Sequence, residues 1–219
     1  MILIILVIGF LLFKKWQFDR SGYFLSSGNG FLRTLFDRGN YGEYLTYRCL
    51  TGMEGYNRIL TNVYLPKDDG ATTEIDLIMI SLKGIFVFES KNYSGWIFGN
   101  EAGPMWTQTL KGGMKNKFYN PIWQNRGHIK ALDSYLGGSY SRRFFSYIVF
   151  SERCTLKNIN LRSRNVYVVK RNELYTELMS HQYIPCLTME EVDNIYETLS
   201  KYANVEEEIK QRHKESLYR

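Results

Sequence analysis

Two neighbouring apolar segments carry the ionisable residues that could do chemistry. Residues 74–80 and 85–91 are rich in β-branched and aromatic side chains, yet Asp76 interrupts the first, and Glu89 and Lys91 fall near the end of the second. Strands that are apolar on both faces belong in the middle of a sheet. An ionised side chain is costly there unless it is paired or bound to a metal ion. The three charged groups therefore need a partner or a function.

The pairing of the two segments decides whether these groups meet. Side chains alternate along a strand, and directly opposed residues of an antiparallel hairpin share a face. With residues 81–84 as a four-residue turn, Asp76 opposes Glu89, and Lys91 lies on the same face. A turn of odd length would separate Asp76 from the other two. We expect the even turn, and so a cluster of two carboxylates and one amine at one edge of a sheet.

Such a cluster suits metal-assisted hydrolysis of a phosphodiester. Two carboxylates a few ångströms apart favour a cation between them, and oxygen ligands of this kind suit Mg²⁺ or Mn²⁺. A lysine beside them can stabilise an attacking hydroxide or the charge of the transition state. A buried salt bridge between Lys91 and either Glu89 or Asp76 explains the same spacing equally well, and the spacing alone does not separate these alternatives.

The charge of the chain is strongly uneven. The 219 residues carry a net charge of +6, but residues 102–172 contain 13 Lys/Arg and only 2 acids, a local charge of +11. A basic segment suits a polyanion or a membrane surface, although it can also be a solvated face without a ligand. The candidate nucleic-acid-binding residues within it are Lys111, Lys115, Lys117 and Arg126. The three lysines flank Gly112-Gly113, which indicates either a basic loop near the site or a solvated hairpin.

The cysteine pattern excludes two classes of small domain. The three cysteines are widely separated and form no C-x-x-C motif, so a zinc ribbon or zinc finger is excluded. An odd and sparse cysteine count also argues against a secreted disulfide scaffold.

The N-terminus is unbroken apolar sequence from residue 1 to residue 13, followed by Lys14-Lys15-Trp16. We expect residues 1–18 to form a short transmembrane helix that anchors the chain, with its lysines reaching the headgroups. By the positive-inside rule these lysines put the rest of the chain on the cytoplasmic side of the cell membrane, as a single-pass protein. The alternative is a buried core helix, the usual meaning of 10 to 14 apolar residues.

The remaining pattern predicts an α/β fold with a mixed central β-sheet flanked by helices. The expected strands are residues 58–65, 74–80, 85–91, 93–98, 105–110, 144–150 and 165–169, with a loop at 66–70. The first expected helix is capped by Asn40, has Glu43 in its first turn and runs to about Leu50. The other expected helices are 121–136 with Asn120 as its N-cap, 172–180, and 188–202 with a capping box at Thr188. We divide the chain into an anchor (1–18), a tether (19–38), the catalytic domain (39–203) and a charged, unpacked tail (204–219).

An ordered series of motifs resembles the NERD (nuclease-related) domain, a branch of the PD-(D/E)XK or restriction-endonuclease-like superfamily. The series consists of Gly42-Glu43, Ile75-Asp76, GIFVFESKNYSG at 84–95, Trp106, and NPIWQN at 120–125 with His128. The likeness covers residues 39–137 and continues more weakly to Val169. One departure is Ile75, where the superfamily places a proline before the aspartate. Some family members carry an N-terminal transmembrane helix, in agreement with the expected anchor.

The resemblance implies a Mg²⁺- or Mn²⁺-dependent endonuclease that acts on DNA, with RNA as a second substrate class. By this resemblance Asp76 and Glu89 hold the metal ion, with the carbonyl of Ser90 as a further ligand, and Lys91 activates water. Glu43 is an accessory ligand or a partner of Lys91, and Gln124 orients the lysine, the water or the phosphate. His128, four residues after Gln124, is expected to be a core or surface histidine.

Two other functions remain open on the residues. The same fold could serve as a catalytically inactive nucleic-acid-binding or scaffold module, which would bind with a steep salt dependence and no turnover. Alternatively, the basic segment could bind anionic lipid headgroups, provided that it faces the same side as the N-terminal helix.

Overall fold

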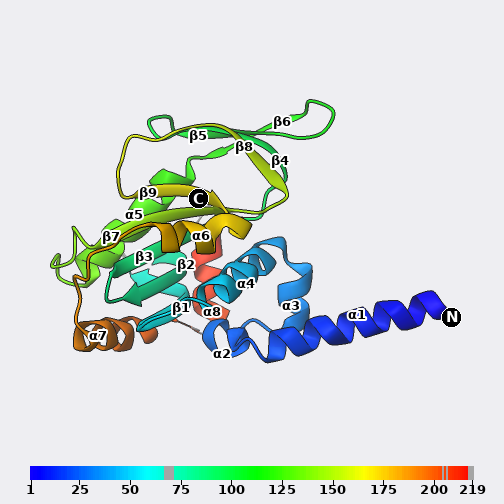
Figure 1. The fold of residues 1–219 in the computed structure, drawn as a ribbon, viewed down its shortest axis with the longest axis horizontal. Helices are drawn as coiled ribbons and strands as arrows, with labels where there is room; N and C mark the ends of the chain where they lie inside the picture. Colours follow the sequence, from blue (N-terminus) through cyan, green and yellow to red (C-terminus); the bar gives the residue numbers. More distant parts are fainter. Residues whose placement is uncertain (67–71, 204, 206, 217–219) are drawn as a thin grey trace.

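A mixed five-stranded sheet forms the centre of the protein (Figure 1). The structure is a computed structural model that describes residues 1–66, 72–203, 205 and 207–216. In order across the sheet, the strands are β1 (Asn57–Pro66), β2 (Thr72–Ser81), β3 (Gly84–Lys91), β7 (Phe144–Phe150) and β9 (Val166–Lys170). The first three are antiparallel neighbours, whereas β7 and β9 continue parallel to β3. The expected α/β class with a mixed central sheet is confirmed.

The β2–β3 hairpin has the predicted register. Ile80 pairs with Ile85 and Ile78 with Val87, as the even turn requires. The turn is tighter than expected, because Ser81 still pairs with Gly84 and only two residues connect the strands. Shortening the turn by two residues keeps the parity, so the faces expected for the paired residues 77–81 and 84–88 are unchanged. The ladder extends to Leu77 and Phe88, one residue short of Asp76 and Glu89.

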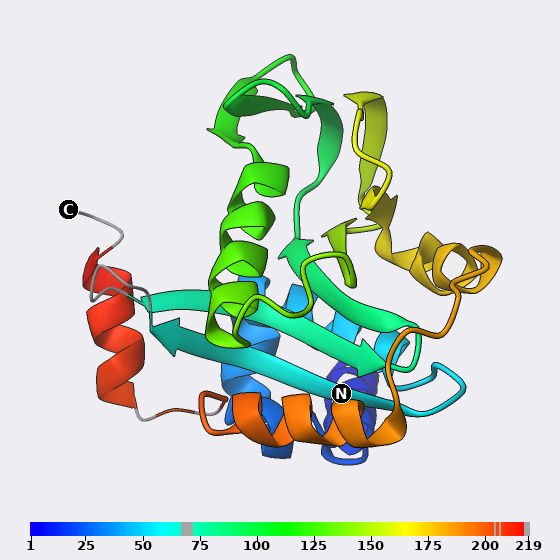
Figure 2. The same cartoon turned by 90° about the vertical axis from the view of Figure 1, so that its left-hand side faces the viewer.

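Two pairs of helices cover the faces of this sheet, which buries both (Figure 2). One face packs against α4 (Arg38–Leu50) and α6 (Arg171–Ser180), and the other against α5 (Pro121–Tyr135) and α7 (Met189–Ser200). Fully burying one aliphatic or aromatic side chain contributes about 1.5–3 kcal/mol, so this double cover is the main source of stability.

The helix starts follow from their capping residues. Asn120 caps α5 by accepting from the amide of Ile122, and Thr188 and Glu191 form the expected capping box of α7. The expected cap of α4 is wrong: Asp37, not Asn40, is the N-cap, and its carboxylate accepts a hydrogen bond from the amide of Asn40. The helix therefore begins three residues earlier than the predicted cap at Asn40 implies.

A second, four-stranded sheet lies above the first in both views (Figures 1 and 2). Its order is β6 (Lys115–Tyr119), β5 (Met105–Thr109), β4 (Gly95–Asn100) and β8 (Cys154–Asn160). The strands β6 and β8 were not predicted, because their lysines and asparagines are untypical of strands. The β5–β6 pairing shows that the basic stretch around Gly112-Gly113 is a hairpin.

The N-terminal region differs most from expectation. The first helix, α1, comprises Ile2–Asp19. It projects from the end of the molecule that lies away from the second sheet (Figure 1). In the part of the chain that the structure describes, no helix is both long and apolar enough to cross a bilayer. The predicted transmembrane helix is therefore not supported; its sequence contains the charged residues Lys14, Lys15 and Asp19.

The expected tether contains two short helices, α2 (Tyr23–Ser27) and α3 (Phe31–Phe36). Phe18 and Tyr23 are buried, and each ring lies 5.4 Å from that of Tyr44 on α4. These contacts attach residues 18–36 to the core. The C-terminal tail also packs: α8 (Glu207–Ser216) contacts the start of β2, where the imidazole of His213 lies 2.9 Å from the Thr72 hydroxyl. The loop expected at 66–70 lies outside the described residues after Pro66.

Candidate active site

The end of β3 brings the predicted amine and one predicted carboxylate into direct contact. Lys91 Nζ donates to Glu89 Oε1 at 2.6 Å, since residues two apart on a strand share a face. The same amine donates to Gln124 Oε1 of α5 at 3.0 Å. Glu89 is buried, while the Lys91 side chain keeps 18% of its surface exposed. Three residues predicted to act together therefore meet at one edge of the central sheet.

Asp76 reaches this edge through an irregularity in β2. Its Oδ2 accepts a hydrogen bond from the amide of Ser90 at 2.8 Å. Opposite it on β1, Asn62 has a left-handed backbone (φ 51°), and the β1–β2 pairing skips Asn62 and Asp76. The side-chain alternation slips here, because Ile75 packs with Ile78 on one face although Leu77 packs on the other. The slip turns Asp76 toward the end of β3.

The cluster contains more buried acidic groups than its single lysine can neutralise. Burial, together with the charges of Glu89 and Glu43, raises the pKa of Asp76 well above its usual value. Burial would also raise the pKa of Glu89, but the Lys91 charge and the His128 hydrogen bond outweigh it and lower that pKa. Burial opposes the charge of Lys91, yet the carboxylates of Glu89 and Asp76 raise its pKa. The lysine thus stays protonated and neutralises only one of the acids.

Glu43 adds a third acid from the other face of the sheet. Burial, followed by the charges of Glu74 and Glu89, raises its pKa to about 8. The preceding Gly42 lets α4 come this close: a Cβ at that position would lie 3.0 Å from the Cβ of Asn92, just after Lys91. The predicted motif Gly42-Glu43 therefore combines a glycine needed for close packing with an acid that interacts electrostatically with Glu89 of the site.

His128, expected to be a core or surface histidine, is a buried histidine that also contacts a predicted site residue. Its Nε2 lies 3.1 Å from Glu89 Oε2. Because an ionised carboxylate only accepts, Nε2 donates, and the hydroxyl of Thr73, 2.7 Å from Nδ1, can donate to the other ring nitrogen. Its spacing of four residues from Gln124 on a helix was the available signal, since such residues lie on one face.

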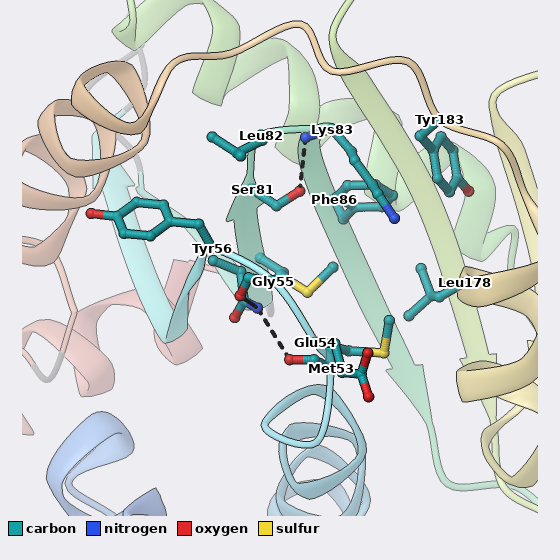
Figure 3. A pocket seen from close by; sticks show the side chains of 12 residues that line it. Met53, Glu54, Gly55, Tyr56, Ser81, Leu82, Lys83, Phe86, Leu178 and Tyr183 are labelled. Atoms are coloured by element: carbon teal, nitrogen blue, oxygen red, sulfur yellow. Dashed lines mark hydrogen bonds between the residues drawn. The ribbon is translucent and has the colours of Figure 1, made fainter.

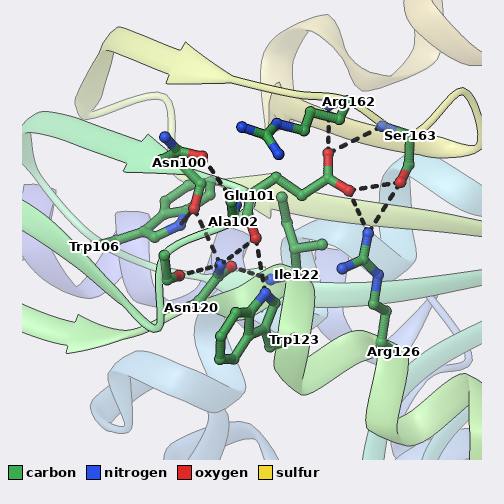
Figure 4. Close-up of polar contacts among 11 residues, drawn as sticks. Asn100, Glu101, Ala102, Trp106, Asn120, Ile122, Trp123, Arg126, Arg162 and Ser163 are labelled. Carbon is green, nitrogen blue, oxygen red and sulfur yellow. Dashed lines mark hydrogen bonds and ion pairs between the residues drawn. The ribbon is translucent and has the colours of Figure 1, made fainter.

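The helix that carries Gln124 and His128 is anchored by the loop after β4 (Figure 4). The side chain of Asn120 donates to the carbonyls of Asn100, Glu101 and Gly103, and the Trp123 indole donates to the Glu101 carbonyl at 2.7 Å.

The Glu101 carboxylate accepts from the amides of Arg162 and Ser163 and from the guanidinium of Arg126. A hydrogen bond from the Ser163 hydroxyl at 2.6 Å and these other bonds lower the pKa of Glu101 to about 2, against the opposing effect of burial. The motif NPIWQN is thus a cap, an anchor and a site residue in one turn.

A polar cleft of about 570 Å³ opens beside Lys91. Its cationic lining residues are Arg38, Lys91 and Arg153, and none of the described residues that line it is acidic. Arg38 and Arg153 were not among the predicted site residues, because nothing in their local sequence separates them from other surface arginines. Folding alone brings them beside the lysine.

Three of the four predicted nucleic-acid-binding residues lie on the hairpin beside this cleft, and none of the four lines it. Lys115 and Lys117 are exposed on β6 and flank Asn116, which does line the cleft, and Lys111 is exposed in the turn of the same hairpin. Arg126 is half exposed and forms an ion pair with Glu101 (Figure 4). The hairpin therefore presents its lysines on the surface next to the cleft.

The donor groups fit a divalent cation that binds through few protein ligands. Among the described residues, no three His, Cys, Asp or Glu side chains form a complete metal site. Magnesium, however, commonly binds through one or two carboxylates, with water and substrate oxygens as its other ligands. The excess of acid over amine at Glu43, Asp76 and Glu89 is the kind of environment that a bound divalent cation relieves. Asp76 and Glu89 are the side chains that would hold it.

A small apolar pocket of about 100 Å³ lies at the other end of the same hairpin (Figure 3). It is lined by Met53, Met79, Phe86 and other side chains near the Leu82-Lys83 turn. It lies at the opposite strand ends from Asp76 and Lys91, so it does not belong to the acid–amine cluster.

Comparison with known proteins agrees with the motifs. The family model described as nuclease-related domain (NERD) matches residues 38–151. An uncharacterized protein of Bacillus anthracis is 34% identical over 182 residues, which is 83% of this chain and 84% of that protein. No solved structure matches significantly. The matched range contains Glu43, Asp76, Glu89, Lys91 and Gln124.

Proposed function

Because this chain belongs to the NERD (nuclease-related domain) family, we propose that it is a divalent-metal-dependent endonuclease that hydrolyses phosphodiester bonds in DNA, with RNA as the second substrate class. The observation that carries the proposal is the meeting of Asp76, Glu89 and Lys91 at one strand edge, directly beside a cationic cleft. Mg²⁺ or Mn²⁺ is the proposed cofactor.

Each residue has a proposed task in the reaction. Asp76 and Glu89, with the carbonyl of Ser90, would hold the cation, which supplies charge stabilisation at the scissile phosphate and a more acidic water. Lys91 stays protonated and donates to the attacking water or to the phosphate oxygens as negative charge develops. Gln124 keeps the amine at that position, and Glu43 is an accessory acid near the cation.

Substrate binding completes the proposal. The exposed Lys111, Lys115 and Lys117 on the hairpin beside the cleft would contact backbone phosphates, and Arg126 would contribute from the start of α5. This binding is sequence-independent and weakens steeply with salt.

The test is cleavage of covalently closed circular DNA, which only an endonuclease can cut. We expect nicking by the full chain with Mg²⁺ or Mn²⁺ and none with EDTA. Lys91→Ala and Asp76→Ala should each abolish it, whereas Lys83→Ala, at the far end of the same hairpin, should not. Equal cleavage by the wild type and by both site variants would refute the proposal.

The contact between Lys91 and Glu89 favours one alternative function. An ion pair of 2.6 Å is also what a catalytically inactive nucleic-acid-binding or scaffold module would keep for stability. Calorimetric titration with Mn²⁺ separates the two: an inactive module gives no binding heat, and its Glu89→Ala variant changes only in stability.

A separate proposal concerns the location of the chain. The side chains of residues 1–8 of α1 are at least half exposed, although all are apolar. Apolar surface of this extent is normally covered in the working protein. We propose that α1 associates with a membrane surface. Co-sedimentation of the full chain with lipid vesicles, lost in Leu3→Glu/Leu6→Glu but kept in Lys83→Glu, tests it, and unbound wild type contradicts it.

A further inference from the structure

We propose that the cleft beside Lys91 binds a backbone phosphate of the nucleic-acid strand through Arg153 and Arg38. The inference rests on the proposed function, because it assigns the substrate contacts of the same site. Its basis is the hydrogen bonding that fixes the Arg153 guanidinium and the Arg38 backbone beside Lys91, in a cleft whose described lining contains no acid.

The strand order fixes Arg153 next to the catalytic lysine. β7 runs parallel to β3, and Phe150 at its end is in register with Lys91. The amide of Ser151 then donates to the Lys91 carbonyl at 2.9 Å. Arg153 follows two residues later, immediately before β8 begins at Cys154. It therefore occupies the junction between the two sheets, at the edge where Lys91 emerges.

The guanidinium of Arg153 is oriented in advance. Its Nε donates to Ser151 Oγ at 3.1 Å, and its Nη2 donates to the carbonyl and the side-chain oxygen of Asn92 at 3.0 and 2.9 Å. Within the described residues, no protein atom accepts a hydrogen bond from Nη1. The guanidinium is therefore held through Nε and Nη2, while Nη1 remains able to donate to a phosphate. Because the side chain is already ordered, it loses little conformational entropy when it binds one.

Asn92 also fixes the opposite wall of the cleft. Its side-chain nitrogen donates to the backbone carbonyl of Arg38 at 2.6 Å, where α4 begins. The close approach at Gly42 presses α4 against Asn92. One asparagine, directly after Lys91, thus sets the distance between the backbone that carries Arg38 and the guanidinium of Arg153.

The two cleft arginines differ from several others in having no described carboxylate as an ion-pair partner. Five other arginines of the described residues form ion pairs with carboxylates: Arg58 with Asp193, Arg126 with Glu101, Arg143 with Glu191, Arg171 with Glu152, and Arg212 with Glu208. In the described part of the chain, neither Arg38 nor Arg153 forms such a pair. Amides of Gln108 and Asn116 and the amine of Lys91 complete a lining suited to an anion. These features distinguish the cleft from a merely solvated basic surface.

The experiment measures binding without catalysis. A fluorescently labelled single-stranded DNA oligonucleotide is titrated with the full chain in EDTA, at several KCl concentrations between about 50 and 200 mM. The variants are Arg153→Gln, Arg38→Gln and the control Arg142→Gln. Arg142 precedes β7, whereas Arg153 follows it, so the length of the strand separates the two arginines by roughly 20 Å. The control therefore makes the same charge change outside the cleft. Thermal unfolding of each variant verifies that it is folded.

We expect Arg153→Gln and Arg38→Gln each to weaken binding roughly fivefold near 0.1 M salt and to reduce the slope of log K against log salt by about 0.7. Arg142→Gln should change neither quantity. Arg38→Gln leaves intact the carbonyl that Asn92 uses, so it decides the matter if Arg153→Gln is unstable.

Wild type without binding, cleft variants that bind like the wild type, or an equal loss in all three variants would overturn the proposal. Its failure is distinguishable from that of the nuclease proposal. A wild type that nicks DNA while the cleft variants bind normally overturns only the cleft. A wild type that binds through the cleft but cleaves nothing with Mg²⁺ or Mn²⁺ overturns only the nuclease.

Discussion

The Lys91 amine donates a hydrogen bond to the side-chain oxygen of Gln124, 3.0 Å away, across the boundary between β3 and α5. Glu89 holds the same amine from the strand side. A lysine side chain has many rotamers, so two fixed acceptors are needed to keep the charge at one position. The Lys91 amine is therefore positioned jointly by a strand and by a helix that begins 30 residues later in the chain, at Pro121.

This relationship predicts an intermediate effect for Gln124→Ala. Loss of one acceptor leaves the amine charged but less well placed, so kcat should fall about tenfold, against roughly 10²–10³-fold for Lys91→Ala. Steady-state cleavage of a labelled duplex measures both, with the exposed Gln182→Ala as control. A Gln124→Ala variant as active as the control would show that the hydrogen bond has no role in turnover.

His128 should act on metal affinity through Glu89. Partners of metal-binding carboxylates typically change affinity or activity by about 10–100-fold when removed. We expect His128→Leu to weaken Mn²⁺ binding by at least about tenfold, and His128→Gln, which keeps a donor near the Nε2 position, to retain most of it. Calorimetry is the measurement. Equal affinities in the two variants, with both folded, would be incompatible with this role.

The raised pKa of Glu43 predicts a pH-dependent stability in the absence of metal. Between about 4.5, the ordinary pKa of the carboxyl, and about 8, the folded state keeps a proton that the unfolded state releases. Stability must then fall as pH rises through this window. Glu43→Gln cannot lose that proton, so the variant should be more stable than the wild type by at least about 1 kcal/mol at pH 8, with little difference at pH 4.5. Urea unfolding in EDTA tests this, and a constant difference across the window would count against it.

Metal binding should show the opposite trend. A divalent cation competes with the protons held by Glu43 and Asp76, so Mn²⁺ affinity should increase from pH 6 to pH 8. The increase should be smaller in Glu43→Gln, which has one proton fewer to displace. Titrations in buffers of different ionisation enthalpy report the protons released. Affinity that does not vary over this range would argue against a cation near these acids.

The local features of the site could be predicted from sequence more fully than their surroundings. The β2–β3 register followed from apolar alternation and an even turn, and the cap of α5 from Asn120-Pro121. Strands β6 and β8 escaped because tertiary pairing, not their own composition, makes them strands. Arg38, Arg153 and Thr73 reach the site only through strand order and helix packing, which no local spacing encodes.

For the N-terminal helix, the local composition predicted a feature that the structure does not support. Apolar composition alone suggested a membrane span, but the length that a span requires is counted along an uninterrupted apolar helix, and the charged residues at 14, 15 and 19 shorten it. Phe18, which the sequence assigned to the anchor, is instead a core residue packed on Tyr44.

Glu101 should stabilise the attachment of α5. Its pKa of about 2 lies below the ordinary value, so its contribution is complete above about pH 4.5 and is lost as pH falls through 2. Glu101→Gln should therefore lower the free energy of unfolding at pH 7 by up to about 3 kcal/mol, and by less at pH 3. Denaturant unfolding of the two proteins at both pH values checks this. A deficit that is the same at both would mean that charge on Glu101 is not the source.

The metal site itself is tested most directly by diffraction from crystals of the full chain soaked with Mn²⁺, using anomalous scattering at the manganese edge. We predict one strong peak about 2 Å from a carboxylate oxygen of Asp76 and about 2 Å from one of Glu89, with the Lys91 amine displaced from Glu89 toward the cleft. A map with no peak between these two carboxylates, and with the ion pair of Lys91 and Glu89 unchanged, would contradict the account.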